Sequence, residues 1–234
     1  MKLLAFDTST EALSIAVGWE AGGRLERLEH SGPGGAQASA TLIPAVQDLL
    51  RRAGLRLQAL DAIVFGRGPG SFTGLRTACS VAQGLAFGAN VPVLPVDTLM
   101  ALAEQARIQQ GATQVVALLD ARMDEVYSAA YAFGDGVWRQ QGEFRLGRPE
   151  ALEVPPGWVL AGNAFKAYGD RLPAAADRIE ALPTAAALLA LAPALLAAGR
   201  AVDAAGALPL YIRDKVAQTT QERADARALA AGPP

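Results

Sequence analysis

The spacing of apolar residues along the chain changes between the period of a strand and the period of a helix. Leu13, Ile15 and Val17 alternate with small or polar residues, which predicts a strand with one buried face. Within residues 42–53 the apolar positions recur at helical spacing, and Gly54 provides an end. The same rules predict further strands over residues 2–6, 62–65, 91–96, 115–119, 127–133 and 158–161, a weaker strand near residues 25–28, and helices over residues 39–53, 73–86, 98–110 and from about residue 184.

The most distinctive stretch is a glycine-rich turn at residues 66–76, between a buried strand and a helix. Such turns often hold a phosphate, because free backbone N–H groups and the positive end of the helix dipole converge there. The turn is not a P-loop, since Gly74 is followed by Leu75 and Arg76. A Rossmann fingerprint also fits poorly, because no acidic residue ends the next strand at the expected distance. Two alternatives stay open: an anion site, or a tight turn that packs the helix on its strand.

One face of the helix after this turn carries only small residues, namely Gly74, Thr77, Ala78, Ala82 and Gly84. A glycine inside a helix costs about 1 kcal/mol relative to alanine, so a helix that keeps one usually has a packing reason. Small side chains allow another element to approach closely. The pattern does not decide whether that element is the chain's own sheet or a second subunit.

The chain contains a short internal repeat. Residues 3–7 match residues 116–120, and each matched segment ends in an aspartate. Six residues later, at Leu13 and Val126, another strand-like run begins. Two lobes that each open with a hairpin and an aspartate point to an α/β protein with the two-lobed actin-like fold, whose lobes are ribonuclease-H-like. We expect a first lobe over residues 1–100, a smaller second lobe over 101–216 whose end packs back on the first, and a mobile tail over 217–234.

Few side chains are suited to catalysis. Asp7 and Asp120 come first, because carboxylates suit Mg²⁺, although an aspartate after a strand also commonly caps its own turn. The single histidine, His30, precedes a loop expected over residues 31–35 and is a poor base for a nucleophile. The single cysteine, Cys79, falls on the apolar face of its helix and fits a small buried hydrophobe. We therefore expect neither a catalytic residue nor a metal site.

Composition narrows the class of protein further. Of the 234 residues, 51% are hydrophobic and 19% are charged, which is typical of a packed globular protein. The net charge is −2, whereas a chain that held nucleic acid by itself would need a basic surface. The longest apolar run, Ala185–Gly199, is shorter than the ~20 residues of a membrane span. With one cysteine and no signal peptide, the chain is expected in the cytoplasm and away from membranes.

The glycine-rich turn, together with residues 1–17 and 118–127, resembles the TsaB family of tRNA threonylcarbamoyladenosine biosynthesis. The resemblance runs from the first residue to about Arg213, and its central sequence Gly-Arg-Gly-Pro-Gly-Ser-Phe-Thr-Gly is specific. It implies the actin-like fold and the role of a non-catalytic partner subunit. Many members keep a histidine just ahead of the first helix, where this chain has Ala38; a scaffold role does not depend on that position.

The resemblance also implies partners. A TsaD-like catalytic subunit would bind the two helices of the first lobe and modify the adenosine after the anticodon in tRNAs that read ANN codons. A TsaE-like ATPase would complete the complex, tRNA would be held mainly through the complex, and the isolated chain would form a homodimer. No cofactor of its own is implied, although ATP or ADP with Mg²⁺ at the interface of the complex is a candidate. The interface residues expected on the helices are Ile43, Val46, Leu50, Gly74, Thr77, Ala78, Val81, Ala82 and Leu85.

A function of another class also stays open, that of a nucleotide-dependent small kinase or ATPase of the actin-like fold. This hypothesis predicts that Mg–ATP binds between the lobes and that ATP turnover is lost when Asp7 is replaced by alanine. The residues expected to bind a nucleotide or another anion are Asp7, Ser9, Gly68, Gly70, Ser71 and Asp120. ATP turnover by the pure protein and binding to a partner separate the two hypotheses.

Overall fold

The computed structural model describes residues 1–174 and 177–213, and it contains two five-stranded sheets with the same strand order. The first sheet, in the order β3-β2-β1-β4-β5, consists of β1 (Lys2–Asp7), β2 (Ala12–Ala21), β3 (Arg24–Pro33), β4 (Ala62–Gly68) and β5 (Val93–Asp97). The second, in the order β8-β7-β6-β9-β10, consists of β6 (Gln114–Arg122), β7 (Glu125–Gly134), β8 (Val137–Gly147), β9 (Val159–Gly162) and β10 (Arg178–Glu180).

The two sheets also agree in strand direction. In the first sheet, β1 pairs antiparallel with β2 and parallel with β4. In the second sheet, β6 pairs antiparallel with β7 and parallel with β9. This repeated topology confirms the duplicated, actin-like and ribonuclease-H-like α/β fold. The tail expected over residues 217–234 lies outside the described residues.

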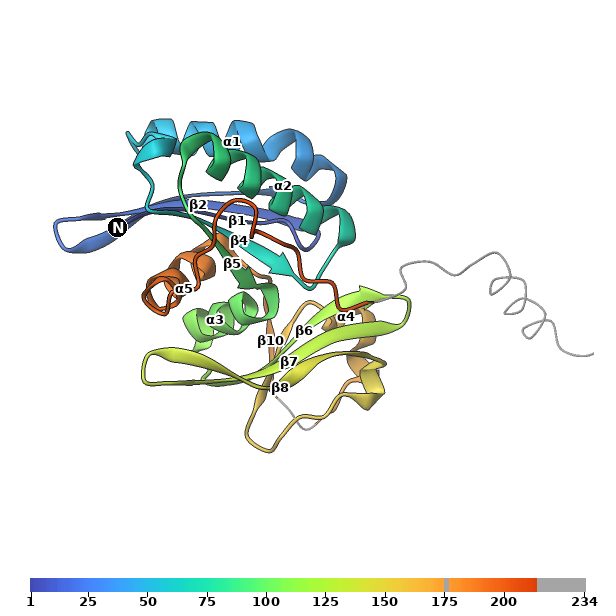
Figure 1. Ribbon diagram of the computed structural model, residues 1–234. Helices are drawn as coiled ribbons and strands as arrows, with labels where there is room; N and C mark the ends of the chain where they lie inside the picture. The colour runs from blue at the N-terminus through green and yellow to red at the C-terminus, as the bar shows by residue number, and fades with distance from the viewer. Residues whose placement is uncertain (175–176, 214–234) are drawn as a thin grey trace, which may run out of the picture.

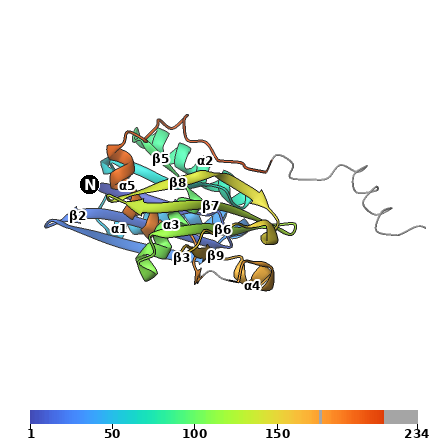
Figure 2. The same cartoon turned by 90° about the horizontal axis from the view of Figure 1, so that it is seen from below.

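Helices divide the molecule into layers. α1 (Ala38–Arg52) and α2 (Phe72–Ala89) cover the outer face of the first sheet, while α3 (Thr98–Gln110) and α5 (Ala185–Ala197) lie between the sheets (Figure 1). Strands β6, β7 and β8 face the viewer in Figure 2, with the four-residue α4 (Phe165–Tyr168) to one side. Among the described helices, none combines the length and apolar character needed to cross a bilayer.

Three hydrophobic clusters follow from this layering. In β1, Leu4 and Phe6 pack outward with α1 and α2, whereas Leu3 and Ala5 pack inward with α3 and α5. The inner cluster also takes in the inward residues of β6 and β7, so it joins the two lobes. A smaller cluster covers the outer face of the second sheet. Since side chains alternate along a strand, a sheet buried on both faces contributes to two clusters at once.

Most element positions agree with the sequence prediction, but β8 and β10 were not predicted, and the first hairpin differs in its length. Residues 31–33 were expected in a loop, but they extend β3 and pair with β2 up to Ala12. His30 therefore lies inside a strand, opposite Ile15. The expected division between residues 100 and 101 falls inside α3.

After α5 the chain returns to the first lobe and then crosses to the second (Figure 1). Val202 pairs with Val93 of β5, and the Leu210 N–H donates to the Arg67 carbonyl at 2.7 Å. The guanidinium of Arg213 then donates to backbone carbonyls of the β6–β7 turn. We call residues 208–213 the strap, because they connect the two lobes.

Candidate functional site

The glycines of the turn at residues 66–76 are required by close packing against the end of β1. A Cβ atom added at Gly66, Gly70 or Gly74 would stand between 1.8 and 2.6 Å from atoms of residues 7–9. Real side chains do not approach that closely, so only glycine fits at these three positions. Of the two alternatives that the sequence left open, the geometry supports a tight turn that packs helix on strand.

Asp7 lies beneath this turn and is 1% exposed. The backbone N–H and the hydroxyl of Ser9 donate to Asp7 Oδ1 at 2.8 and 2.6 Å. Asp7 Oδ2 faces Gly66 and has no hydrogen-bond partner among the described residues. Burial raises the pKa of Asp7 to about 6, because a charged carboxylate is poorly solvated there. Asp7 is therefore buried and does not face solvent.

A cleft of about 430 Å³ lies between the lobes beside this buried region. Four of the six residues predicted to bind an anion line it, whereas Asp7 and Gly68 do not. The strap and the β6–β7 turn contribute arginines to its wall. The predicted residues that do line the cleft are Ser9, Gly70, Ser71 and Asp120.

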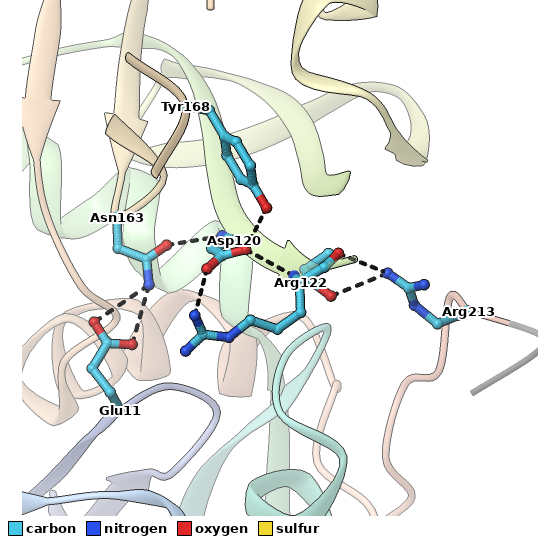
Figure 3. Close-up of polar contacts among 7 residues, drawn as sticks. Glu11, Asp120, Arg122, Asn163, Tyr168 and Arg213 are labelled. Atoms are coloured by element: carbon cyan, nitrogen blue, oxygen red, sulfur yellow. Dashed lines mark hydrogen bonds and ion pairs between the residues drawn. The ribbon is translucent and has the colours of Figure 1, made fainter. Parts of the chain in front are cut away.

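In this cleft, both carboxylate oxygens of Asp120 already interact with neighbouring side chains and backbone groups (Figure 3). Its Oδ1 accepts from the Arg122 N–H at 2.8 Å and from the Tyr168 hydroxyl at 3.0 Å, and its Oδ2 pairs with the Arg122 guanidinium at 2.9 Å. Burial, together with the hydrogen bond to Asp120, raises the pKa of Tyr168. Asn163 Oδ1 accepts from the Asp120 N–H, and Asn163 Nδ2 donates to Glu11 Oε2 at 3.2 Å, which connects the lobes across the cleft.

Asp7 lies on the inner face of the first sheet, whereas Asp120 lies on the outer face of the second. The two aspartates therefore do not occupy the equivalent positions that the repeat in the sequence had suggested. Asp7 follows the inward residues of β1 and contacts Gly66. Asp120 follows Val116 and Leu118, which pack outward. The carboxylates therefore do not converge on one point, and no group of three or more His, Cys, Asp or Glu among the described residues could hold a metal ion.

Arg213 is a feature of the cleft that sequence reasoning did not find. Its guanidinium donates to the Ala121 and Arg122 carbonyls at 3.0 and 3.4 Å and pairs with Glu125 at 2.8 Å. The turn that receives it has three consecutive residues with positive φ, residues 122–124. No local pattern marks this contact, since its partners lie about 90 residues apart in the chain.

The predicted interface residues divide into two groups. Val46, Leu50, Gly74, Ala78 and Ala82 are buried in the chain's own core, so they are not available on its surface. Ile43 is 40% exposed, and the other three are partly exposed. The members that remain at the surface are Ile43, Thr77, Val81 and Leu85.

The outer side of α2 presents a row of small residues at Thr77, Val81, Gly84 and Gly88, which we call the seam. Its spacing of four, three and four residues places the row along one line of the helix. No atom lies within 4 Å of a Cβ added at Gly84 or Gly88, so nothing in the described chain packs against them. Phe87 beside the seam is 85% exposed, a feature that the sequence analysis did not find.

Comparison with known proteins identifies the family. Residues 33–221 match the family model described as TsaD: tRNA N6-adenosine threonylcarbamoyltransferase. The chain is 39% identical over 176 residues to the tRNA threonylcarbamoyladenosine biosynthesis protein TsaB of Escherichia coli (strain K12). The matched residues make up 73% of this chain and 74% of that protein. It is 45% identical over 127 residues to the protein of the same name from Haemophilus influenzae, covering 54% of this chain and 52% of that protein.

Solved structures agree with this assignment. YeaZ from Pseudomonas aeruginosa is 44% identical to this chain and matches it with a TM-score of 0.83. The match covers 90% of this chain and 99% of that one, so it includes both lobes. The sequence motif, the repeated topology and these similarities lead to one conclusion: the chain belongs to the TsaB family.

Proposed function

We propose that this chain is a non-catalytic partner subunit in tRNA threonylcarbamoyladenosine biosynthesis, which binds and activates a TsaD-like catalytic subunit. The main support is the seam of α2, which includes two uncovered glycines, Gly84 and Gly88, and lies beside the exposed Phe87. Family membership gives the pathway, and the seam gives the surface through which the chain would act.

The seam has the features of a helix–helix contact. Residues spaced by four and three positions face one neighbouring helix, and small side chains let its backbone approach. Gly84 and Gly88 each cost the isolated helix about 1 kcal/mol relative to alanine, and no intrachain contact explains them. Phe87, which precedes Gly88 in α2, would supply exposed apolar area beside the seam, and Ile43 is an exposed apolar residue of α1. A partner helix accounts for all of these features together.

The inter-lobe cleft supports a role without catalysis of its own. Asp7 is buried and Asp120 is paired with Arg122, so neither carboxylate is free for a metal ion or a reacting group. The lone histidine lies in β3 and the lone cysteine lies buried in α2. In this proposal the chemistry belongs to the partner.

The remaining members of the proposed complex follow from the family. A TsaE-like ATPase completes it, tRNA is held mainly through the other subunits, and the isolated chain forms a homodimer through the same helices in the cytoplasm. The net charge of −2 agrees with a minor share of tRNA binding. ATP or ADP with Mg²⁺ at the interface of the complex stays a prediction.

A substitution at Gly84 tests the proposal without disturbing the core. Gly84→Arg places a long side chain on an exposed helix position where nothing packs, so the variant should fold at least as stably as wild type. We expect it to abolish binding to the TsaD-like subunit from the same organism in size-exclusion chromatography and calorimetry. Gln109→Arg, on an exposed position of α3, is the matched control and should bind like wild type. Thermal melts of both variants verify folding.

Two outcomes contradict the proposal. Equal binding by Gly84→Arg and wild type would locate the contact on another surface. Failure of the wild type to bind the partner, together with ATP turnover by the pure chain, would favour the ATPase of the actin-like fold. In that case Asp7→Ala should abolish turnover, whereas the buried position of Asp7 predicts a change in stability only.

A further inference from the structure

We propose that Phe72, Arg76 and Tyr211 form a docking site for a carboxylate-bearing, apolar segment of the protein partner. We call these three residues the arginine ledge. The inference rests on the proposed function, because the partner is the same, and it adds a charged contact at the N-terminal end of α2. Two of the three residues come from α2 and the third comes from the strap.

The ledge is a compact stack of side chains. The Arg76 guanidinium lies 3.9 Å from the centre of the Phe72 ring, and Arg76 Nε donates to the Tyr211 hydroxyl at 3.2 Å. The two aromatic rings have centroids 5.4 Å apart and are tilted by 37°. Phe72 is 38% and Tyr211 45% exposed, so both rings present apolar area beside an exposed cation.

The backbone around the ledge holds it in place before any partner binds. The Leu210 N–H donates to the Arg67 carbonyl, and Arg213 fixes the other side of Tyr211 to the second lobe. At the start of α2, the Ser71 hydroxyl accepts from the Gly74 N–H. An arginine that is already stacked loses less side-chain entropy when it binds a carboxylate, which favours its use as an anchor.

Arg76 differs from neighbouring arginines in its charge balance. Arg67, Arg122 and Arg213 each pair with a carboxylate, at 2.7 to 2.9 Å. Within the described part of the chain, no ion pair includes Arg76. Two hollows of about 390 and 460 Å³ adjoin Arg76, and no carboxylate lines either of them. The ledge therefore has a positive charge that an acidic partner side chain would balance.

The observations favour a protein segment over RNA. A phosphate backbone is held by several cations, whereas the ledge offers a single cation, Arg76, in a chain of net charge −2. Arginine and tyrosine are enriched among residues that dominate protein–protein contacts. The larger hollow also continues along α2 past Thr77 to Val81, so the ledge is continuous with the seam.

Binding measurements at two salt concentrations test the ledge. We expect Arg76→Gln to weaken binding to the TsaD-like subunit about tenfold at about 50 mM salt, because a charge-assisted contact is lost. The variant should also lose part of the salt dependence seen for wild type, since screening acts on the missing pair. Arg76→Lys keeps the charge and should retain that salt dependence. Arg139→Gln, an exposed arginine of β8, is the control and should bind like wild type.

The outcomes separate this inference from the proposed function. If wild type and Arg76→Gln bind the partner equally and with the same salt dependence, the ledge inference fails while the partner proposal stands. If wild type does not bind at all, both fail. If protein binding is unchanged but a tRNA anticodon stem-loop binds the assembled complex more weakly with Arg76→Gln, the occupant is RNA and the inference is overturned. Circular dichroism melts show whether each variant is folded.

Discussion

The two lobes have the same sheet and differ in what covers it. The first sheet is enclosed, with α1 and α2 outside and α5 inside, whereas the second has α3 inside and only the four-residue α4, short 3-10 helices and loops outside. The outer helices of the first lobe therefore do two things: they bury one face of the sheet, and they present the seam to solvent. The two sheets keep the same strand order, whereas the helices and loops that cover them give each lobe a different surface.

The aspartates at the ends of β1 and β6 show the same divergence. Asp7 is buried against glycine, while Asp120 lies at the cleft in a network with Arg122 and Tyr168. Because neighbouring positions on a strand face opposite sides, an offset of one residue is enough to change the environment of a side chain. Similar sequence positions in the two lobes therefore place the two aspartates in different surroundings.

The largest expected effect concerns the close packing of α2 on the first lobe. Gly74→Ala would place a Cβ 1.8 Å from the Thr8 carbonyl oxygen, so we expect a loss of about 4 kcal/mol in the free energy of unfolding. Gly162→Ala in the second lobe makes the same approach to the Leu118 carbonyl and should cost as much. Urea unfolding measures both. Gly84→Ala, on the open side of α2, should instead stabilise by about 1 kcal/mol.

Asp7→Asn tests whether burial of the Asp7 carboxylate makes the stability of the protein depend on pH. The pKa of Asp7 is raised to about 6 by burial, so the folded state binds a proton that the unfolded state releases near pH 3.8. Its contribution to stability is present below pH 3.8 and is lost as pH rises through about 6. Asn stays neutral, so the variant should be more stable than wild type at pH 7, by up to about 3 kcal/mol, and equal at low pH. A parallel pH dependence of both proteins in urea unfolding would contradict this.

Arg213→Ala tests the connection between the lobes. The substitution removes two hydrogen bonds to turn carbonyls and an ion pair with Glu125, from a side chain that is only 12% exposed. We expect a loss of about 2 kcal/mol and faster proteolysis at the β6–β7 turn. Arg139→Ala, whose pair with Asp135 is exposed, should change stability by less than about 0.5 kcal/mol. Equal effects of the two variants would show that the strap does not hold the lobes together.

The smallest effect concerns the inner helices that join the lobes. The Thr184 hydroxyl caps α5 by accepting from the Ala187 N–H, and it donates to Gln105 Oε1 of α3. Thr184→Ala should therefore lower stability by about 1 kcal/mol, while Thr184→Ser should keep most of it. Thermal unfolding of the two variants gives the comparison, and an unchanged midpoint for the alanine variant would rule out the cap as a contributor.

Local patterns predicted the fold well where polar and apolar residues contrast. The amphipathic spacing over residues 42–53 and the alternation in β2 identified their elements, and the matched segments at the two strands revealed the duplication. The two matched segments were aligned out of register, so that matched residues face opposite sides of their sheets. Residues 3–6 and 115–119 are continuous apolar runs in strands buried on both faces. Without alternation, nothing in such a run shows which face its last residue takes.

The candidate sites needed the structure for a related reason. Alanine and glycine in α2 carry little contrast in hydrophobicity, so sequence could not separate Ala78 and Ala82 in the core from Gly84 at the surface. The seam, the ledge and the contact of Arg213 all depend on the angles at which distant segments pack.

Local backbone geometry and hydrophobic period were enough to predict most of the elements, the duplicated topology and the glycine-rich turn. Contacts between distant segments were needed to show which small residues face solvent, which aspartate is buried, and that Arg76, unlike Arg67, Arg122 and Arg213, has no carboxylate partner among the described residues, because each of these depends on neighbours far along the chain.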